Sequence, residues 1–185
     1  MCRDNDRRAQ KQLYEYYAKQ LFGVCVRYVR NEADAEEVLL NAFYKIMTNL
    51  NRFEEKNTGT FEGWMYRITV NEALMFLRSK QSSDWQRIFE LDAQYDIPHE
   101  IYTDTQLLEN DIIQLLDLLP TGYRTVFNLY AIEGYQHKEI AEILSVSINT
   151  SKSQLIKARA MLRKLLAKLN YPMSFDGDST DHEQE

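Results

Sequence analysis

The chain has 185 residues and a formal net charge of −6, with 44% hydrophobic residues but only six glycines and three prolines. This length accommodates one domain or two small ones, and the scarcity of glycine and proline favours long helices over turn-rich β structure. The negative net charge argues against a general polyanion binder, but the charge is unevenly distributed. An acidic segment at 83–133 precedes a basic stretch at 152–168 that contains no acid.

The N-terminal part of the chain predicts three helices. Apolar residues at steps of three and four predict a helix over 7–30. A second helix is expected over 34–50, with acidic residues in its first turn, where the helix dipole favours negative charge. The polar segment 51–60 predicts a loop, and Thr60 begins a third helix that extends to Lys80.

The next part of the chain predicts a linker and two further helices. Residues 82–104 are rich in acids, although Trp85 and Phe89 are apolar enough for a short helix that docks on a neighbour. A helix over 107–119 would stop before Pro120. Another over 122–132 would end at a glycine cap.

Residues 136–168 have the pattern of a helix-turn-helix. A short amphipathic helix ends at Leu144, a polar turn of three residues follows, and every charge from Lys152 to Lys168 is positive. Such a pair of helices commonly places its second helix in the DNA major groove, although a hairpin with a solvated basic face remains an alternative. The following side chains are expected to face phosphates or base edges: Asn149, Lys152, Ser153, Ile156, Lys157 and Arg159.

Aromatic residues gather around the 51–60 loop, namely Phe53, Phe61, Trp64 and Tyr66, with Arg67 nearby to supply positive charge. Opening a duplex requires surfaces on which unstacked bases can stack, and such stacking is worth roughly 1–3 kcal/mol per base. The cluster is therefore a candidate for melting DNA. The alternative is that each ring is an ordinary core aromatic.

The sequence contains no P-loop, no glycine-rich dinucleotide turn and no His/Cys metal spacing. We therefore expect no catalytic residue, no metal, no cofactor and no small-molecule substrate. No secretory h-region and no apolar run of roughly 18 residues is present, which predicts a cytoplasmic protein without membrane insertion. Cys2 and Cys25 are expected to be free thiols, and His137 a surface or phosphate-neighbouring residue rather than a ligand.

Two sets of motifs resemble regions of bacterial sigma factors. Leu118-Leu-Pro-x-x-Tyr-Arg-x-Val-Phe-x-Leu129, Glu133-Gly-Tyr, Glu139-Ile-Ala-x-x-Leu144 and Ser147-x-x-Thr-x-x-Ser153 together resemble region 4. Asp34-Ala-Glu-Glu-Val38 with Ala42-Phe43, and Phe61-x-x-Trp64-Met-Tyr-Arg-Ile68-x-x-Asn71, resemble region 2. Since no other sigma domain fits between them, the chain resembles the extracytoplasmic-function (ECF) group.

The resemblance implies an all-α protein of two small helical domains joined by an acidic linker. A region 2-like domain would occupy 1–81, the linker 82–104, a region 4-like domain 105–170 and an acidic tail 171–185. The implied function is that of an alternative sigma subunit, with core RNA polymerase, promoter DNA and an anti-sigma factor as partners. The basic helix would then read the −35 element.

The family motifs carry the remaining candidate sites over to this chain. By resemblance, one set of residues binds polymerase: Asp34, Glu37, Val38, Asn41 and Phe43. A second set contacts or melts the −10 element: Arg52, Phe53, Phe61, Trp64, Arg67 and Asn71.

Some positions depart from the family pattern. Leu40-Asn41 stands where the family usually carries Gln-Glu or Gln-Asp, and Ser151 stands where the recognition helix usually has an aliphatic residue. Glu54 and Glu55 also lie in a loop expected to approach DNA. These departures leave open a degenerate sigma-like protein-interaction module. A helix-turn-helix regulator independent of polymerase is the other alternative.

Overall fold

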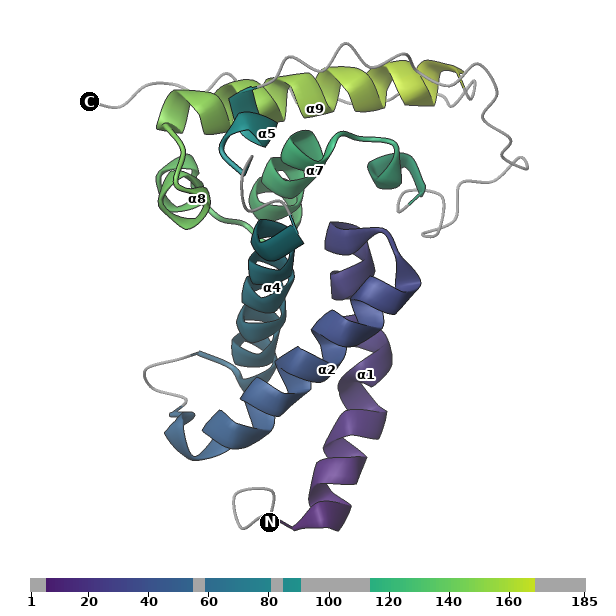
Figure 1. Cartoon of the computed structure of the whole chain (residues 1–185), viewed down its shortest axis with the longest axis vertical. Coiled ribbons are helices and arrows are strands. Elements are labelled where there is room, and N and C mark those ends of the chain that lie inside the picture. The colour runs from purple at the N-terminus through teal and green to yellow at the C-terminus, as the bar shows by residue number, and fades with distance from the viewer. Residues whose placement is uncertain (1–5, 55–58, 81–84, 91–113, 169–185) are drawn as a thin grey trace.

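The computed structural model describes residues 6–54, 59–80, 85–90 and 114–168, and every regular element in these ranges is a helix (Figure 1). The predicted all-α fold class is therefore confirmed. The helices form two groups, one from each half of the chain.

The first group consists of α1 (Arg7–Val29), α2 (Glu32–Asn49) and α4 (Phe61–Lys80), which pack against one another. The second helix begins earlier than predicted. Its N-cap is Asn31, whose side-chain oxygen accepts hydrogen bonds from the backbone N–H groups of Ala33 and Asp34. A short 3-10 turn, η2 (Leu50–Arg52), follows α2, and the hydroxyl of Thr60 accepts a bond from the N–H of Gly63 at the start of α4.

The core of this group is formed by side chains that recur every three or four residues along each helix. Its buried members include Leu21, Val24, Tyr28, Val38, Ile46, Met65, Val70, Ala73 and Leu77.

The second group consists of α7 (Thr121–Phe127), a π-helical segment η3 (Asn128–Ile132), α8 (His137–Leu144) and α9 (Ile148–Lys168). The Glu139 carboxylate accepts a hydrogen bond from the N–H of Gln136 at the start of α8. Ser145 ends that helix in a left-handed conformation with φ 59°, and the Ser147 hydroxyl then caps α9. The predicted helix-turn-helix and its three-residue turn are confirmed.

The two groups are held together by polar contacts between α1 and the α7–η3 segment. Arg124 is buried and donates hydrogen bonds to the carbonyl of Tyr28 at 2.8 Å and to that of Leu119 at 3.3 Å. Arg27 forms an ion pair with Glu133 at 2.9 Å, with only 19% and 12% of the two side chains exposed. The hydrophobic cluster of the first group continues into the second across this interface.

A short helix from the predicted linker docks on the second group, as expected. This helix is α5 (Arg87–Glu90). The Trp85 indole donates to the carbonyl of Leu144 at 3.2 Å, and the Gln154 amide donates to the carbonyl of Phe89. Gly122 permits the approach, because a Cβ there would lie 2.7 Å from the Ile88 carbonyl oxygen.

The predicted domain limits remain predictions. Most of the linker at 82–104, most of the predicted helix at 107–119, and the whole tail at 171–185 lie outside the described residues, as do Cys2 and Glu55.

Candidate functional site

One face of α9 carries the residues that the sequence predicted to face DNA. Asn149, Lys152, Ile156 and Arg159 are exposed, whereas Ser153 and Lys157 are partly exposed. Ile156 is an apolar side chain with 67% of its surface exposed. The opposite face of α9 is buried and includes Ser151, Gln154, Leu155, Ala158, Met161 and Leu165.

The unusual serine on the buried face has a polar partner. Ser151 is completely buried, and its hydroxyl oxygen lies 2.9 Å from Nδ1 of His137 at the start of α8. The His137 ring stacks on Tyr130 at 4.6 Å between centroids, and the Arg159 guanidinium lies 5.7 Å from the centroid of the same tyrosine. His137 is thus half-buried between helices; the sequence predicted a surface or phosphate-neighbouring residue rather than a ligand and did not indicate the contact with Ser151.

The aromatic cluster forms at the loop before α4. Phe53 lies 5.2 Å from Phe61 and 5.4 Å from Trp64 between ring centroids, and Phe61 stacks on Trp64 at 5.7 Å. All three rings are half-buried, so they belong neither to the closed core nor to free solvent. Packing against one another leaves part of each ring accessible at the surface.

Polar groups extend from this cluster along α4. Trp64, Arg67 and Asn71 recur at steps of three and four residues, which places them on one side of the helix, and both Arg67 and Asn71 are exposed. Arg52 is also exposed, at the end of η2. Of the six residues that the sequence predicted for the −10 element, the structure brings the three aromatic rings into contact and places Arg67 and Asn71 on the same side of α4 as Trp64.

A hydrogen bond that the sequence did not predict supports the cluster from α1. The Tyr17 hydroxyl donates to the Glu62 carboxylate at 2.8 Å, and the Tyr17 ring lies against Phe61 at 6.4 Å. Burial and this bond raise the pKa of Tyr17 to about 12. The pKa of Glu62 is lowered by a bond to its own backbone N–H and by the Tyr17 hydroxyl. At neutral pH the Glu62 carboxylate is therefore ionised and the Tyr17 hydroxyl keeps its proton.

The residues expected to bind polymerase divide into two kinds. Glu37 and Asn41 are exposed on α2, and Asp34 is partly exposed and lies 3.4 Å from the ammonium of Lys80. Val38 and Phe43 are 1% and 4% exposed in the core of the first group. These two side chains can position α2, but they do not present a surface to a partner.

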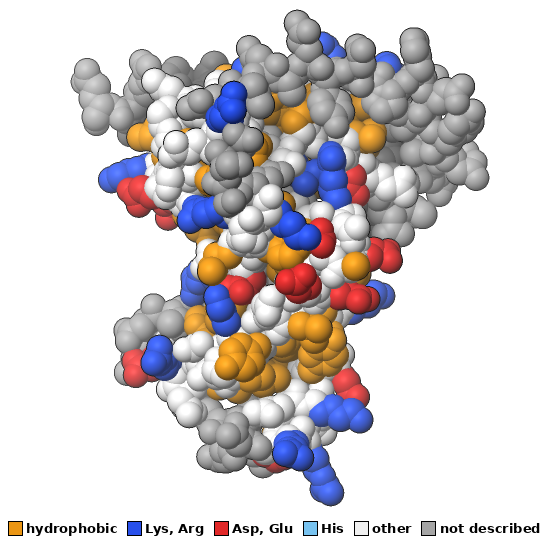
Figure 2. All heavy atoms as spheres, viewed as in Figure 1, with side chains coloured by type: hydrophobic (Ala, Val, Ile, Leu, Met, Phe, Trp, Pro, Cys, Tyr) orange, Lys and Arg blue, Asp and Glu red, His pale blue; other side chains and the backbone are white. Residues whose placement is uncertain are grey.

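Two apolar side chains that the sequence did not assign lie on the outer face of α2. Leu40 is 60% exposed and Tyr44, one turn later, is 70% exposed. A groove between α1 and α2 borders Leu40 and is lined also by Tyr14 and Phe22. Figure 2 shows hydrophobic side chains gathered on this part of the first helical group. Leu40 of α2 thus lies next to Tyr14 of α1 on an apolar part of the surface, and Tyr44 extends it by one turn of α2.

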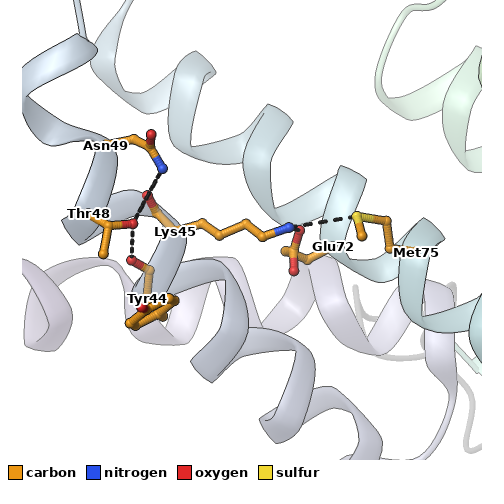
Figure 3. A network of polar contacts seen from close by, with 6 residues as sticks. All are labelled: Tyr44, Lys45, Thr48, Asn49, Glu72 and Met75. Atoms are coloured by element: carbon orange, nitrogen blue, oxygen red, sulfur yellow. Dashed lines mark hydrogen bonds and ion pairs between the residues drawn. The ribbon is translucent and has the colours of Figure 1, made fainter.

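An ion pair joins α2 to α4 between the two candidate surfaces (Figure 3). The Lys45 ammonium reaches from α2 to the Glu72 carboxylate, which has 10% of its side chain exposed, and also lies 3.7 Å from the sulfur of Met75. Asn71 and Glu72 both line a groove beside this pair. The contact therefore ties α4 to α2 beside Asn71.

The described residues contain no group of three or more His, Cys, Asp or Glu side chains that could hold a metal ion. In the same part of the chain, no helix is both long enough and apolar enough to cross a membrane. Cys25 is a buried free thiol whose pKa is raised by burial to about 12.

Comparison with known families and proteins identifies both halves of the chain. Residues 13–83 match the model of Sigma-70 region 2, and residues 109–162 match that of Sigma-70, region 4. The ECF RNA polymerase sigma factor SigE of Mycolicibacterium smegmatis is 30% identical over 161 residues, which cover 85% of this chain and 61% of that protein. The ECF RNA polymerase sigma factor SigW of Bacillus subtilis is 28% identical over 179 residues, covering 89% and 92%.

A solved structure also shares the fold. The sigma factor RpoE in complex with the anti-sigma factor NepR from Bartonella quintana superposes with a TM-score of 0.52 at 21% identity. The match covers 85% of this chain and 96% of that one. At this identity the similarity supports the fold.

Proposed function

Because this chain belongs to the extracytoplasmic-function group of bacterial sigma-70 factors, we propose that it binds core RNA polymerase and directs promoter recognition, melting and transcription initiation. The observation that supports the proposal is the presence, on two helical groups, of two different surfaces with side chains suited to DNA. One is the basic face of α9, and the other is the aromatic cluster at the start of α4.

The α9 face is suited to read a duplex −35 element. Lys152, Lys157 and Arg159 provide positive charge for phosphates or guanine edges, and Asn149 can pair with an adenine edge. Ile156 can contact a thymine methyl group, and Ser153 can bond to a base or a phosphate. The first turn of α9 contains no acidic residue that would repel the DNA phosphates.

The cluster at α4 is suited to hold unpaired bases of a −10 element. Trp64 and its two phenylalanine neighbours offer ring surface for stacking, and Asn71 can bond to the edge of an extruded base. Arg52 and Arg67 can neutralise the adjacent phosphates. Two modest contacts on one chain combine through effective concentration, so neither has to be strong alone.

The outer face of α2 is suited to bind the polymerase. Asp34, Glu37 and Asn41 supply polar groups, and Leu40 beside them supplies apolar area. Burying a leucine side chain at an interface contributes about 1.5 kcal/mol or more. Leu40 thereby compensates for the polar residue that the family usually has at this position.

The proposed role includes an anti-sigma factor that covers these surfaces, since the related Bartonella protein was solved with such a partner. It also places the protein in the cytoplasm with the polymerase. RNA synthesis would be carried out by the polymerase, and no catalytic residue is assigned to this chain.

Run-off transcription with purified core polymerase and a library of randomised upstream DNA tests the proposal. Transcripts that start at a fixed distance from a shared two-part motif support it. Binding to duplex DNA without initiation would instead indicate a polymerase-independent regulator, and binding to neither DNA nor polymerase would indicate an interaction module.

The Leu40→Asp variant tests the proposed polymerase surface when its affinity for core polymerase is measured directly. We expect at least a tenfold weaker affinity for core polymerase, because a charge replaces the apolar contact. Ile132→Asp is a matched control, since Ile132 is also an exposed apolar residue but lies in η3 of the second group. Equal affinities for both variants and the wild type would exclude Leu40 from the interface.

A further inference from the structure

The contact between His137 and Ser151 lies at a mechanically important place in the helix-turn-helix. His137 is the first residue of α8, and the tight turn that leads into α9 lies at the other end of α8. At 1.5 Å per residue these two points are separated by about 10 Å. The recognition helix is therefore tied to α8 at two places, and two separated ties fix the angle between the helices.

We propose that His137 is a positioning residue for the recognition helix, which it holds in register through Ser151 and through the Tyr130 ring. This inference rests on the proposed −35 function of α9. Ser151 immediately precedes Lys152, so a change in the position of Ser151 also moves the first DNA-facing side chains of the helix.

The bond to Ser151 is directional, which apolar packing is not. The Ser151 hydroxyl is completely buried, and a buried hydroxyl is unfavourable unless it forms a hydrogen bond. Nδ1 of His137 lies 2.9 Å away and can take either role in the bond, depending on the ring tautomer. Ile140 and Leu144 are buried in the same apolar cluster as Leu155 of α9, and this packing holds the two helices together without a directional bond.

The second contact reaches the same helix further along. The His137 ring stacks on Tyr130 with an interplanar angle of 23°, and Tyr130 belongs to η3, outside the two helices. Arg159 lies within cation–π distance of Tyr130 and about two turns beyond Ser151 on α9. His137 and Tyr130 thus contact α9 at two positions: His137 at the Ser151 hydroxyl, and Tyr130 at the Arg159 guanidinium.

Four variants separate the two contacts. His137→Asn keeps a side-chain nitrogen near the position of Nδ1 but removes the ring, and His137→Phe keeps a ring but removes the nitrogen. Ser151→Ala removes the hydroxyl, and the double variant His137→Phe/Ser151→Ala removes both partners. Each full-length variant is assembled with core polymerase and titrated against labelled promoter DNA with an intact or a scrambled −35 element.

We expect Ser151→Ala and His137→Phe each to reduce discrimination between the two DNAs about threefold to tenfold. The double variant should lose no more than either single variant, because both changes remove the same bond. His137→Asn should retain only part of the discrimination, because it keeps the bond to Ser151 but loses the ring contact with Tyr130. Holoenzyme affinity for a pre-melted −10 template that lacks a −35 element should be unchanged, which a general folding defect would not allow.

Wild-type discrimination by all four variants would overturn the positioning role, and so would losses that follow only the unfolding temperatures of the variants. A wild-type holoenzyme that does not discriminate between the two DNAs would overturn the proposed −35 function itself. The two failures are therefore distinguishable.

Discussion

Replacement of Trp64 by alanine tests the melting role of the aromatic cluster. The change removes an indole that packs against Phe53 at 5.4 Å and against Phe61 at 5.7 Å. It has two separable consequences, a loss of folding stability and a loss of stacking surface for an unpaired base.

The two magnitudes can be worked out from the burial of the ring. A fully buried tryptophan replaced by alanine costs about 3–5 kcal/mol, and since Trp64 is only half-buried we expect about 2 kcal/mol. Loss of one stacking contact removes about 1–3 kcal/mol from the open complex. This corresponds to a fraction of open promoter that is about 5-fold to 150-fold smaller.

The assay measures permanganate reactivity of unpaired thymines in the −10 element, alongside affinity for the closed complex at low temperature. Phe76→Ala is the matched control, because Phe76 is also a half-buried aromatic residue on α4, about three turns further along. We expect Trp64→Ala to lose opening while it keeps closed-complex binding, and Phe76→Ala to lose stability alone. Normal opening by Trp64→Ala, or an equal loss in both variants, would refute the stacking role.

Three further predictions concern other parts of the molecule. Lys152→Ala and Lys157→Ala should each weaken binding to the −35 element and make the plot of log affinity against log salt less steep by about 0.9. Unchanged slopes would exclude phosphate contacts by these lysines. Burial raises the pKa of the Cys25 thiol to about 12 and so disfavours the reactive thiolate. In a variant that lacks the other cysteine, Cys25 should react with a disulfide reagent at pH 8 far more slowly in the folded protein than in urea. Equal rates would contradict its burial. A double-mutant cycle of Arg27→Ala and Glu133→Ala in urea unfolding should give a coupling of about 1 kcal/mol, and no coupling would mean that the two helical groups do not meet through this pair in solution.

The helices and the helix-turn-helix were predictable because their signals are local. Apolar spacing, the glycine at 134 and the turn at 145–147 each act within a few residues. The start of α2 was placed two residues too late because Asn31 and Asp34 are both good capping residues. The choice between them depends on how α1 ends, and Arg30 ends it with a positive φ of 64°.

The π-helical segment and the interface between the groups were not predictable in this way. Arg124 is part of a family motif, but nothing in the sequence indicates that its guanidinium is buried against the backbone of α1. The Ser151 departure likewise finds its compensation fourteen residues earlier, in His137. Such pairings depend on tertiary structure that periodicity does not report.

The candidate polymerase site shows how motif and burial complement each other. Resemblance selected Val38 and Phe43, and both lie inside the apolar stripe of α2 that faces the core. Leu40 and Tyr44 lie outside that stripe. The helical period could therefore have identified them as exposed apolar residues.

The central claim is that one chain reads two promoter elements with two helical groups. It is tested most directly by run-off transcription on four templates: one with both elements, one with the −35 element scrambled, one with the −10 element scrambled, and one with about half a helical turn inserted between them. We expect strong transcription from the first template alone, since the insertion rotates one element away from its reader. Equal transcription from the intact and the half-turn templates would contradict bipartite recognition by this protein.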